Sequence, residues 1–451
     1  MASHPPFALV SNKIATPNVI RPGAVLIKDG SIEGVASKNT VPENYKVVDV
    51  GDATILPGLV DTHVHVNEPG RTEWEGFASA TQAAAAGGVT TILDMPLNSS
   101  PVTTTVAALD VKRKAAEGKL TIDCGFVGGV IPGNADDLTP MAKEGVHAFK
   151  AFMIHSGINE FPHVREADLR SAMSVLAERD LPLLVHAELC AAGEDEATMP
   201  NPRAYQSFLD SRPRRWENDA ITLALSLAKE LHCRLHIVHL SSADAIEPLA
   251  RAKNDGVAVT VETCPHYLVF EAESIPDGST FHKCCPPIRE AENREALWKG
   301  LTDGVIDMIV SDHSPSTPEL KALESGDFSE AWGGIAGLQF SLPSIWTEAN
   351  TRGIGLERIT AWMASVPADT MGIAKKGRIA PGCQADLTVF DLDQKTVVAA
   401  DIIHHRHKRT PYEGRSLAGL VTRTILAGET VYENGIFPGV PRGRALRKEA
   451  A

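Results

Sequence analysis

The sequence lacks the features that mark several common classes of protein. Its 451 residues hold only 43 lysines and arginines against 57 aspartates and glutamates, which gives a formal net charge of −14. A nucleic-acid binder needs a basic face to neutralise phosphates, so this balance argues against one. No run of 18 apolar residues occurs in the chain, and a transmembrane helix needs a run of about that length. We therefore expect neither nucleic acid nor a membrane as a partner.

Cysteine is also scarce and shows no pairing pattern. The odd number of thiols and the absence of a CxxC motif argue against a disulfide framework and favour reduced cytosolic thiols, which stand at Cys124, Cys190, Cys233, Cys264, Cys284, Cys285 and Cys383. The start, MASHPPFALV, has no basic segment followed by a long apolar one, and the end, KEAA, is not an SKL address. A cytoplasmic protein without a signal peptide is the expectation.

Eight short, β-branched apolar runs alternate with alanine-rich helical stretches through the middle of the chain. The runs span residues 55–66, 89–95, 122–129, 146–153, 181–188, 235–240, 257–264 and 307–313. Apolar runs of this length between helices indicate buried parallel strands. Eight such units predict an α/β fold of the (β/α)8 TIM-barrel type, with an open, doubly wound sheet as the alternative.

The two ends of the chain have a different pattern. Residues 1–54, 378–391 and 419–433 contain strand-like pieces separated by Gly and Asp, without a helical period. Neither end can readily bury a core alone, so we predict that both termini build one small composite β-sandwich. The predicted division is 1–54 and 378–451 for the two parts of the sandwich, and 55–377 for the barrel.

The strongest local motif is DTHVHVNEPG, residues 61–70. His63 and His65 are two positions apart on a predicted strand, so both imidazoles point to the same face. At the carboxyl end of a first barrel strand, that face is the mouth of the barrel. Two neutral imidazoles placed in this way can coordinate a metal ion.

Polar residues also occur on or at the end of other predicted strands. Lys150 lies inside the apolar run VHAFKAFM, where a lysine cation would be costly to desolvate. It either extends its amine to solvent or is neutral and has captured CO2 as a carbamate. His186, His239 and Asp312 each follow an apolar run, at the end of the strand that forms the catalytic face of a TIM barrel. Together these residues predict a metal site, with ligands His63, His65, Lys150, His186, His239 and Asp312.

The charges of this ligand set suit two divalent metal ions. Their positive charge slightly exceeds that of a carbamate, an aspartate and a bridging hydroxide, and such an excess lowers the pKa of bound water and polarises a carbonyl. Imidazole and carboxylate ligands suit zinc, and they leave cobalt, manganese and iron open.

Longer segments carry a resemblance to a known family. The segments GLVDTHVHVNEPGRTEWEGF, AAAAGGVTTILDMPLNSSP, FKAFM, VETCPHYL, SDHSP, AWGGIAGLQ and KGRIAPGCQADLTVFD resemble those of the cyclic amidohydrolases, a branch of the amidohydrolase superfamily, in sequence and in order. The resemblance implies a TIM barrel with a composite β-sandwich and a homotetramer. It also implies a pair of zinc ions bridged by carboxylated Lys150, the ligand set given above, and Asp312 as the catalytic acid–base.

The choice of branch depends on the residue two positions after the second histidine. Dihydroorotases usually have an arginine there, which clamps the substrate carboxylate, whereas this chain has Asn67. The chain is most similar to the branch that hydrolyses neutral allantoin to allantoate in purine catabolism. The substrate contacts implied are Asn67, Asn98, Cys285 and Gly334, with Cys285 standing where related enzymes often have serine. A hydantoinase or dihydropyrimidinase, and a non-catalytic scaffold related to dihydropyrimidinase, remain the alternatives.

Overall fold

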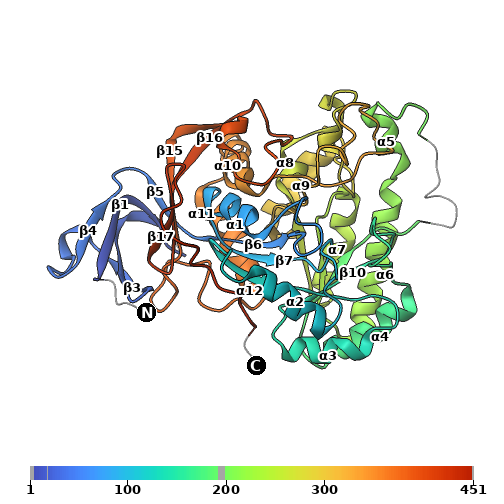
Figure 1. The fold of residues 1–451 in the computed structure, drawn as a ribbon, viewed down its shortest axis with the longest axis horizontal. Coiled ribbons are helices and arrows are strands. Elements are labelled where there is room, and N and C mark those ends of the chain that lie inside the picture. Colours follow the sequence, from blue (N-terminus) through green and yellow to red (C-terminus); the bar gives the residue numbers. More distant parts are fainter. Residues whose placement is uncertain (1–4, 18, 191–198, 449–451) are drawn as a thin grey trace.

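Parallel strands surround the centre of the protein and carry helices on their outer side (Figure 1). The structure, a computed structural model, describes residues 5–17, 19–190 and 199–448; the chain ends, on which the expected absence of targeting signals depends, lie partly outside this range. The barrel strands are β6 (Leu59–Val64), β7 (Val89–Asp94), β8 (Asp123–Phe126), β9 (Gly128–Gly129), β10 (Phe149–Phe152), β11 (Leu183–His186), β12 (Leu235–Ile237), β13 (Val259–Thr263) and β14 (Met308–Ile309). Each predicted apolar run contains at least one of these strands, and the third run, 122–129, contains both β8 and β9.

The strands close into a barrel. Strands β6, β7 and β8 pair in that order, and β9 to β14 pair in sequence order. The ring closes just beyond β14, where Val64 forms a parallel bridge with His313 and the His65 amide donates to the carbonyl of His313 at 2.8 Å. Nearby, the Ser311 amide donates to the Asp61 carboxylate at 3.0 Å. The TIM-barrel prediction is confirmed, and the open sheet was the wrong alternative.

Helices connect the strands and cover the outside of the barrel. They are α1 (Phe77–Ala86), α2 (Val106–Ala116), α3 (Ala135–Lys143), α4 (Glu166–Ala177), α5 (Tyr205–Ser211), α6 (Arg214–Leu231), α7 (Ile246–Asn254), α8 (Pro265–Val269), α9 (Ala291–Thr302), α10 (Ser341–Thr351), α11 (Leu356–Thr360) and α12 (Val366–Thr370). Short single-turn segments lie at η1 (Lys38–Thr40), η2 (Ala243–Ala245), η3 (Ala272–Ser274), η4 (Thr280–His282), η5 (Leu338–Phe340), η6 (Ala361–Ser365) and η7 (Ala400–Ile402).

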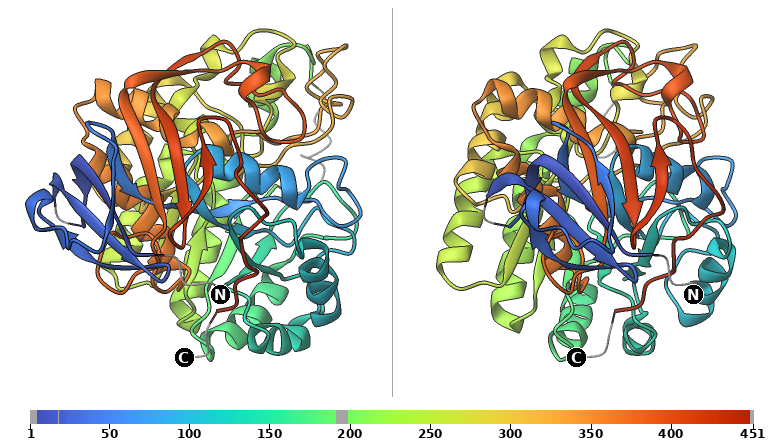
Figure 2. Two further views of the ribbon diagram at one scale, coloured as in Figure 1. Left: turned by 60° about the vertical axis from the view of Figure 1, so that its left-hand side comes forward. Right: turned by 90° about the vertical axis from the view of Figure 1, so that its left-hand side faces the viewer.

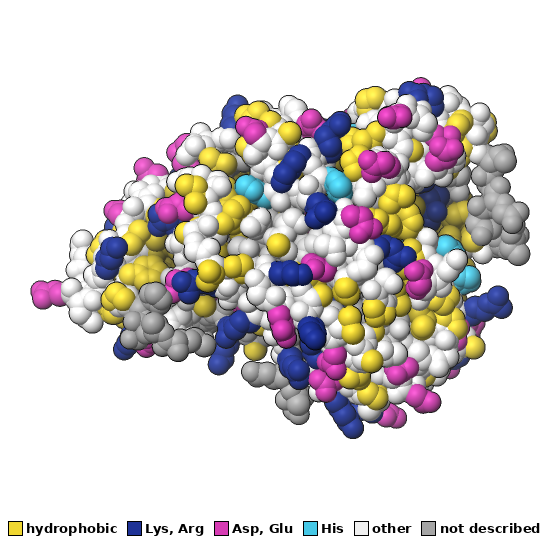
Figure 3. All heavy atoms as spheres, viewed as in Figure 1, with side chains coloured by type: hydrophobic (Ala, Val, Ile, Leu, Met, Phe, Trp, Pro, Cys, Tyr) yellow, Lys and Arg dark blue, Asp and Glu magenta, His cyan; other side chains and the backbone are white. Residues whose placement is uncertain are grey.

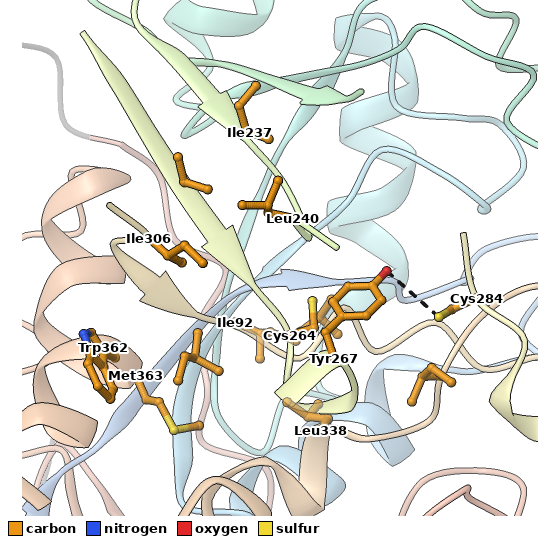
Figure 4. Close-up of a cluster of buried hydrophobic side chains, with 14 of the residues drawn as sticks. Ile92, Ile237, Leu240, Cys264, Tyr267, Cys284, Ile306, Leu338, Trp362 and Met363 are labelled. Atoms are coloured by element: carbon orange, nitrogen blue, oxygen red, sulfur yellow. Dashed lines mark hydrogen bonds between the residues drawn. The ribbon is translucent and has the colours of Figure 1, made fainter. Parts of the chain in front are cut away.

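The alternation of side chains along each strand separates two hydrophobic cores. On β11, Leu183 and Val185 pack in the cluster that includes Ala224 of α6, whereas Leu184 packs with Val60 and other residues of the barrel interior. Figure 4 shows part of the larger cluster, in which strand residues meet helical segments and Cys284 contacts the Tyr267 hydroxyl. Because successive side chains of a strand point to opposite faces, one apolar layer fills the inside of the barrel and another lies between the strands and the helices.

Strands from both ends of the chain form one further sheet. Its members are β1 (Phe7–Ala15), β2 (Ile20–Lys28), β3 (Ser31–Ala36), β4 (Lys46–Asp49), β5 (Thr54–Pro57), β15 (Leu387–Val397), β16 (Ser416–Leu426) and β17 (Glu429–Glu433). The order is β17-β16-β15-β5-β1-β2-β3, with β4 beside β1. Figure 2 shows the blue amino-terminal strands beside the red carboxyl-terminal ones. The composite β-domain predicted from the two ends is thus present.

The predicted first run, 55–66, is two strands rather than one. Gly58 separates β5, in the composite sheet, from β6, in the barrel. A Cβ atom at Gly58 would lie 2.2 Å from the Thr90 hydroxyl oxygen, so only glycine permits this close approach. The domain boundaries remain a prediction, and β5 lies across the first of them.

Charged side chains of both signs lie on the surface. Basic and acidic side chains are interspersed over the face shown in Figure 3. Within the part of the chain that the structure describes, every helix is too short or too polar to cross a bilayer.

Candidate metal centre

Three predicted ligands converge where the barrel closes. His63 is on β6, His65 follows it, and Asp312 follows β14. Oδ1 of Asp312 lies 3.3 Å from Nε2 of His63 and 3.5 Å from Nε2 of His65. All three residues are buried, and their ligand atoms lie within 4.8 Å of one another. Two imidazole nitrogens and one carboxylate oxygen are therefore close enough together to hold a metal ion.

A second pair of predicted ligands meets on the neighbouring strands. His186 ends β11, and His239 follows β12. Nδ1 of His186 lies 2.9 Å from Nε2 of His239. The ring of His239 is also 5.4 Å from that of His63, centroid to centroid. The two groups of ligands are thus adjacent parts of one site.

Lys150 of β10 is fully buried, and its charge acts on His63, His186 and His239. Its amine has no hydrogen-bond partner among the described residues. Burial lowers the pKa of Lys150 to about 8, while the charges of Glu262 and Asp312 oppose that shift. The alternative of a solvent-exposed amine is therefore wrong, and the buried amine is partly neutral near physiological pH.

Neighbouring acceptors determine which ring nitrogen each histidine presents. His63 donates from Nδ1 to Glu262, and His65 donates from Nδ1 to the Leu97 carbonyl at 2.7 Å. Each then presents the lone pair of Nε2 to the Asp312 side. His186 pairs through Nε2 with Glu188, which leaves Nδ1 facing His239. Such partners fix the tautomer and orientation of metal-binding histidines.

The electrostatics favour the ionisation states that bind cations. Burial lowers the pKa of His63, His186 and His239, so these imidazoles are neutral. Burial alone would raise the pKa of Asp312, but His63 and His65 outweigh it and lower the pKa to about 2. Neutral imidazoles beside an ionised carboxylate are suitable metal ligands. The orphaned buried Nζ of Lys150 and Nε2 of His63 are atoms that a bound metal centre would satisfy.

The candidate ligands His63, His65, His186, His239 and Asp312 line a cavity of about 570 Å³. Its wall includes the predicted substrate contacts Asn98, Cys285 and Gly334. Asn67 is not one of the described residues that line it: its side chain is fully buried and donates to the Pro315 carbonyl. The expectation that Asn67 faces the mouth of the barrel is wrong. It assumed that side chains keep alternating as in a strand up to position 67, but β6 ends at Val64. The structure therefore separates Asn67 from the other three.

The sequence of this chain matches the model of the amidohydrolase family over residues 54–431. That span covers the whole barrel and every candidate ligand described above. The chain belongs to the amidohydrolase family. The chain is therefore a hydrolase, and the site described above lies within the matched span.

Named relatives of this amidohydrolase are close in sequence and structure. It is 49% identical over 446 residues to an allantoinase of Streptomyces avermitilis, covering 98% of each chain. It is 46% identical to an allantoinase of Saccharomyces cerevisiae, covering 91% of this chain and 90% of that one. An L-hydantoinase (dihydropyrimidinase) from Arthrobacter aurescens superposes with a TM-score of 0.92 at 31% identity, over 98% of this chain and all of that one.

The amidohydrolase site also contains residues that sequence reasoning missed. Glu262 accepts from His63 and from the His239 amide, and Glu188 pairs with both His186 and Arg212. A signal was available for each. Glu262 is an acid within the apolar run VAVTVETC, and Glu188 follows His186 by two residues. A buried carboxylate needs a hydrogen-bond or ion-pair partner, but the local sequence does not identify that partner.

Proposed function

We propose that the protein is an allantoinase, which hydrolyses the cyclic amide of the hydantoin ring of allantoin to give open-chain allantoate. One observation carries the proposal: four histidines and Asp312 gather at a cavity, and the charge of a buried, partly neutral lysine acts on three of these histidines and on Asp312. High identity to named allantoinases along nearly the whole chain supports the choice of substrate. The proposal includes a cytoplasmic homotetramer, as composition and family resemblance suggest.

The proposed cofactor is a pair of zinc ions bridged by carboxylated Lys150. His63, His65 and Asp312 would hold one ion, and His186 and His239 the other. Bound zinc would polarise the substrate carbonyl and make water a stronger nucleophile. The carbamate turns an uncompensated buried amine into an anionic oxygen donor, and Phe149 and Phe152, on either side along β10, are buried and help to exclude bulk water.

Asp312 is the proposed proton carrier. Its Oδ1 atom faces His63 and His65, which leaves Oδ2 to accept a proton from the attacking water. The carbon–nitrogen bond of the ring breaks as a carbon–oxygen bond forms, and Asp312 returns the proton to the leaving nitrogen. The low pKa of Asp312 keeps it ionised before the reaction.

Asn98, Cys285 and Gly334 are the proposed substrate contacts. The Asn98 side-chain oxygen has no partner among the described residues, so it can accept from a ureido nitrogen. Burial raises the pKa of Cys285, which keeps the thiol protonated and argues against a nucleophilic role. Asn67 acts only indirectly in this proposal, through the packing beneath the site.

Steady-state kinetics on a panel of allantoin, hydantoin, dihydrouracil and dihydroorotate test the proposal. We expect the highest kcat/KM for allantoin. Because the L-hydantoinase superposes so well, a hydantoinase is the second candidate, and a higher value for hydantoin or dihydrouracil would favour it. Metal analysis tests the scaffold alternative, which predicts a chain without bound zinc.

A further inference from the structure

Lys112 is one of several buried cations that lie outside the proposed metal centre. Lys112 of α2 is fully buried, although it lies on a helix at the outside of the barrel. Its amine forms an ion pair of 2.6 Å with Asp94, the last residue of β7. The neighbouring Lys114, two residues further along the same helix, is exposed. A fully buried ammonium is costly unless several acceptors satisfy it.

The acceptors of Lys112 all belong to one short segment. Besides Asp94, the amine donates to the Met95 carbonyl and to the Ser99 hydroxyl, each at 3.1 Å. The three contacts span the turn that leaves the carboxyl end of β7. Lys112 thus ties the beginning of this turn to its end.

The same turn makes two contacts with the segment that carries His65. The Leu97 carbonyl accepts from Nδ1 of His65 at 2.7 Å, and Oδ1 of Asp94 accepts from the Val66 amide at 2.8 Å. The turn also places Asn98 in the wall of the cavity. The orientation of one proposed metal ligand therefore depends on where this turn lies.

We propose that Lys112 is a positioning residue for the metal centre. By holding Asp94, Met95 and Ser99 together, it keeps the Leu97 carbonyl where it fixes the tautomer and ring orientation of His65. The inference rests on the proposed function, because it takes His65 to be a zinc ligand. Lys112 itself touches neither substrate nor metal.

Chelator competition against zinc, without substrate, tests the inference. The parent protein with two bound zinc ions should show two phases. In Lys112→Met, which keeps a linear side chain but removes the donors, the affinity of one phase should fall about 10- to 100-fold, as is typical for the loss of outer-shell partners. Lys114→Met, the exposed control on the same helix, should match the parent in both phases. A merely structural role would weaken both phases alike or neither, and either result would overturn the inference.

Lys112→Met leaves Asp94 buried without its cation, so it can fail to fold. The double variant Asp94→Asn/Lys112→Met removes both charges and should fold, as circular dichroism and thermal melting would report. We expect the same one-phase loss of affinity. If this variant binds zinc like the parent, or if neither variant folds, the pair serves the fold alone and the inference is wrong. A parent protein that binds no zinc would instead refute the proposed metal centre, so the two failures are distinguishable.

Discussion

Nε2 of His186 lies 2.8 Å from Oε2 of Glu188. Burial would raise the pKa of Glu188, but Arg212 and His186 outweigh it and lower the pKa to about 2. The ionised carboxylate can only accept, so the proton of His186 resides on Nε2 and Nδ1 carries the lone pair. Nδ1 then faces Nε2 of His239 at 2.9 Å. A residue outside the ligand set therefore decides which atom of His186 can bind zinc.

We expect Glu188→Gln to weaken zinc binding about 10- to 100-fold, because the amide is a weaker acceptor and can also present its NH2 group to His186. Chelator competition measures the change. Glu330→Gln is the matched control, since Glu330 also lines the cavity but contacts no proposed ligand in the described structure. Equal zinc affinity of Glu188→Gln and the parent would contradict the prediction.

Asp312→Asn should remove most of the turnover while keeping the fold. The amide still offers an oxygen to metal but cannot carry a proton, and general acid–base catalysis is worth roughly 10²- to 10⁴-fold in rate. The measurement is kcat for allantoin at equal zinc content. Activity within about threefold of the parent would exclude the proton-carrying role.

Lys150→Ala should lose both activity and zinc, because the proposed bridging carbamate disappears. Small carboxylates such as acetate or propionate fit the space left by the side chain and supply the missing oxygen donors, so they should restore part of each. Zinc content and activity are measured with and without the added acid. Full zinc and activity in Lys150→Ala alone would show that no carbamate is needed.

Loading of the zinc-free protein should become faster as pH rises. Carbamate formation requires a neutral amine, and with a pKa of about 8 Lys150 is mostly protonated below that pH and mostly neutral above it. The rate of reactivation by zinc, at constant dissolved CO2, should thus rise between about pH 7 and 9 and then level off. A rate that is constant or falls over this range would contradict the assignment.

The sequence alone was sufficient for the barrel and for which polar side chains gather at its mouth; that these side chains bind metal stays a prediction. The strand-end positions of His186, His239 and Asp312 follow from local apolar runs, and a TIM barrel brings strand ends together whatever lies between them. The position of Asn67 was not predictable in this way. Strand alternation holds only while the chain remains a strand, and β6 ends at Val64.

Apart from Glu188, which is two residues from His186, the partners of the candidate ligands could not be predicted, because they lie far away in the chain. Glu262 is 199 positions from His63, and no periodic pattern links two residues so distant. Likewise, the sequence of α2 predicts a helix on the outside of the barrel, but it does not reveal that the Lys112 side chain extends inward to Asp94. Such contacts depend on the relative position of packed elements, which only the folded chain defines.

The two basic side chains in the described cavity wall that could attract an anionic ring are already occupied. Arg212 makes two contacts with Glu188, at 3.1 and 2.6 Å. Lys283 donates to the Phe328 and Ala331 carbonyls, and burial lowers its pKa. A carboxylate entering the cavity would lose its hydration without gaining a free cation.

We therefore predict that the protein turns over dihydroorotate poorly or not at all, while it hydrolyses neutral allantoin. Introducing an arginine at position 67, two residues after His65, should not reverse this preference. Asn67 is fully buried against Pro315, so Asn67→Arg overpacks the site and should cost about 1–3 kcal/mol of stability without offering its guanidinium to the cavity. Steady-state kinetics and competitive inhibition by dihydroorotate, with thermal melting of both proteins, are the measurements. Tighter dihydroorotate binding in a stable Asn67→Arg protein would show that position 67 does reach the cavity. Parent turnover of dihydroorotate equal to that of allantoin would overturn the argument from occupied cations, and the assignment of a neutral substrate with it.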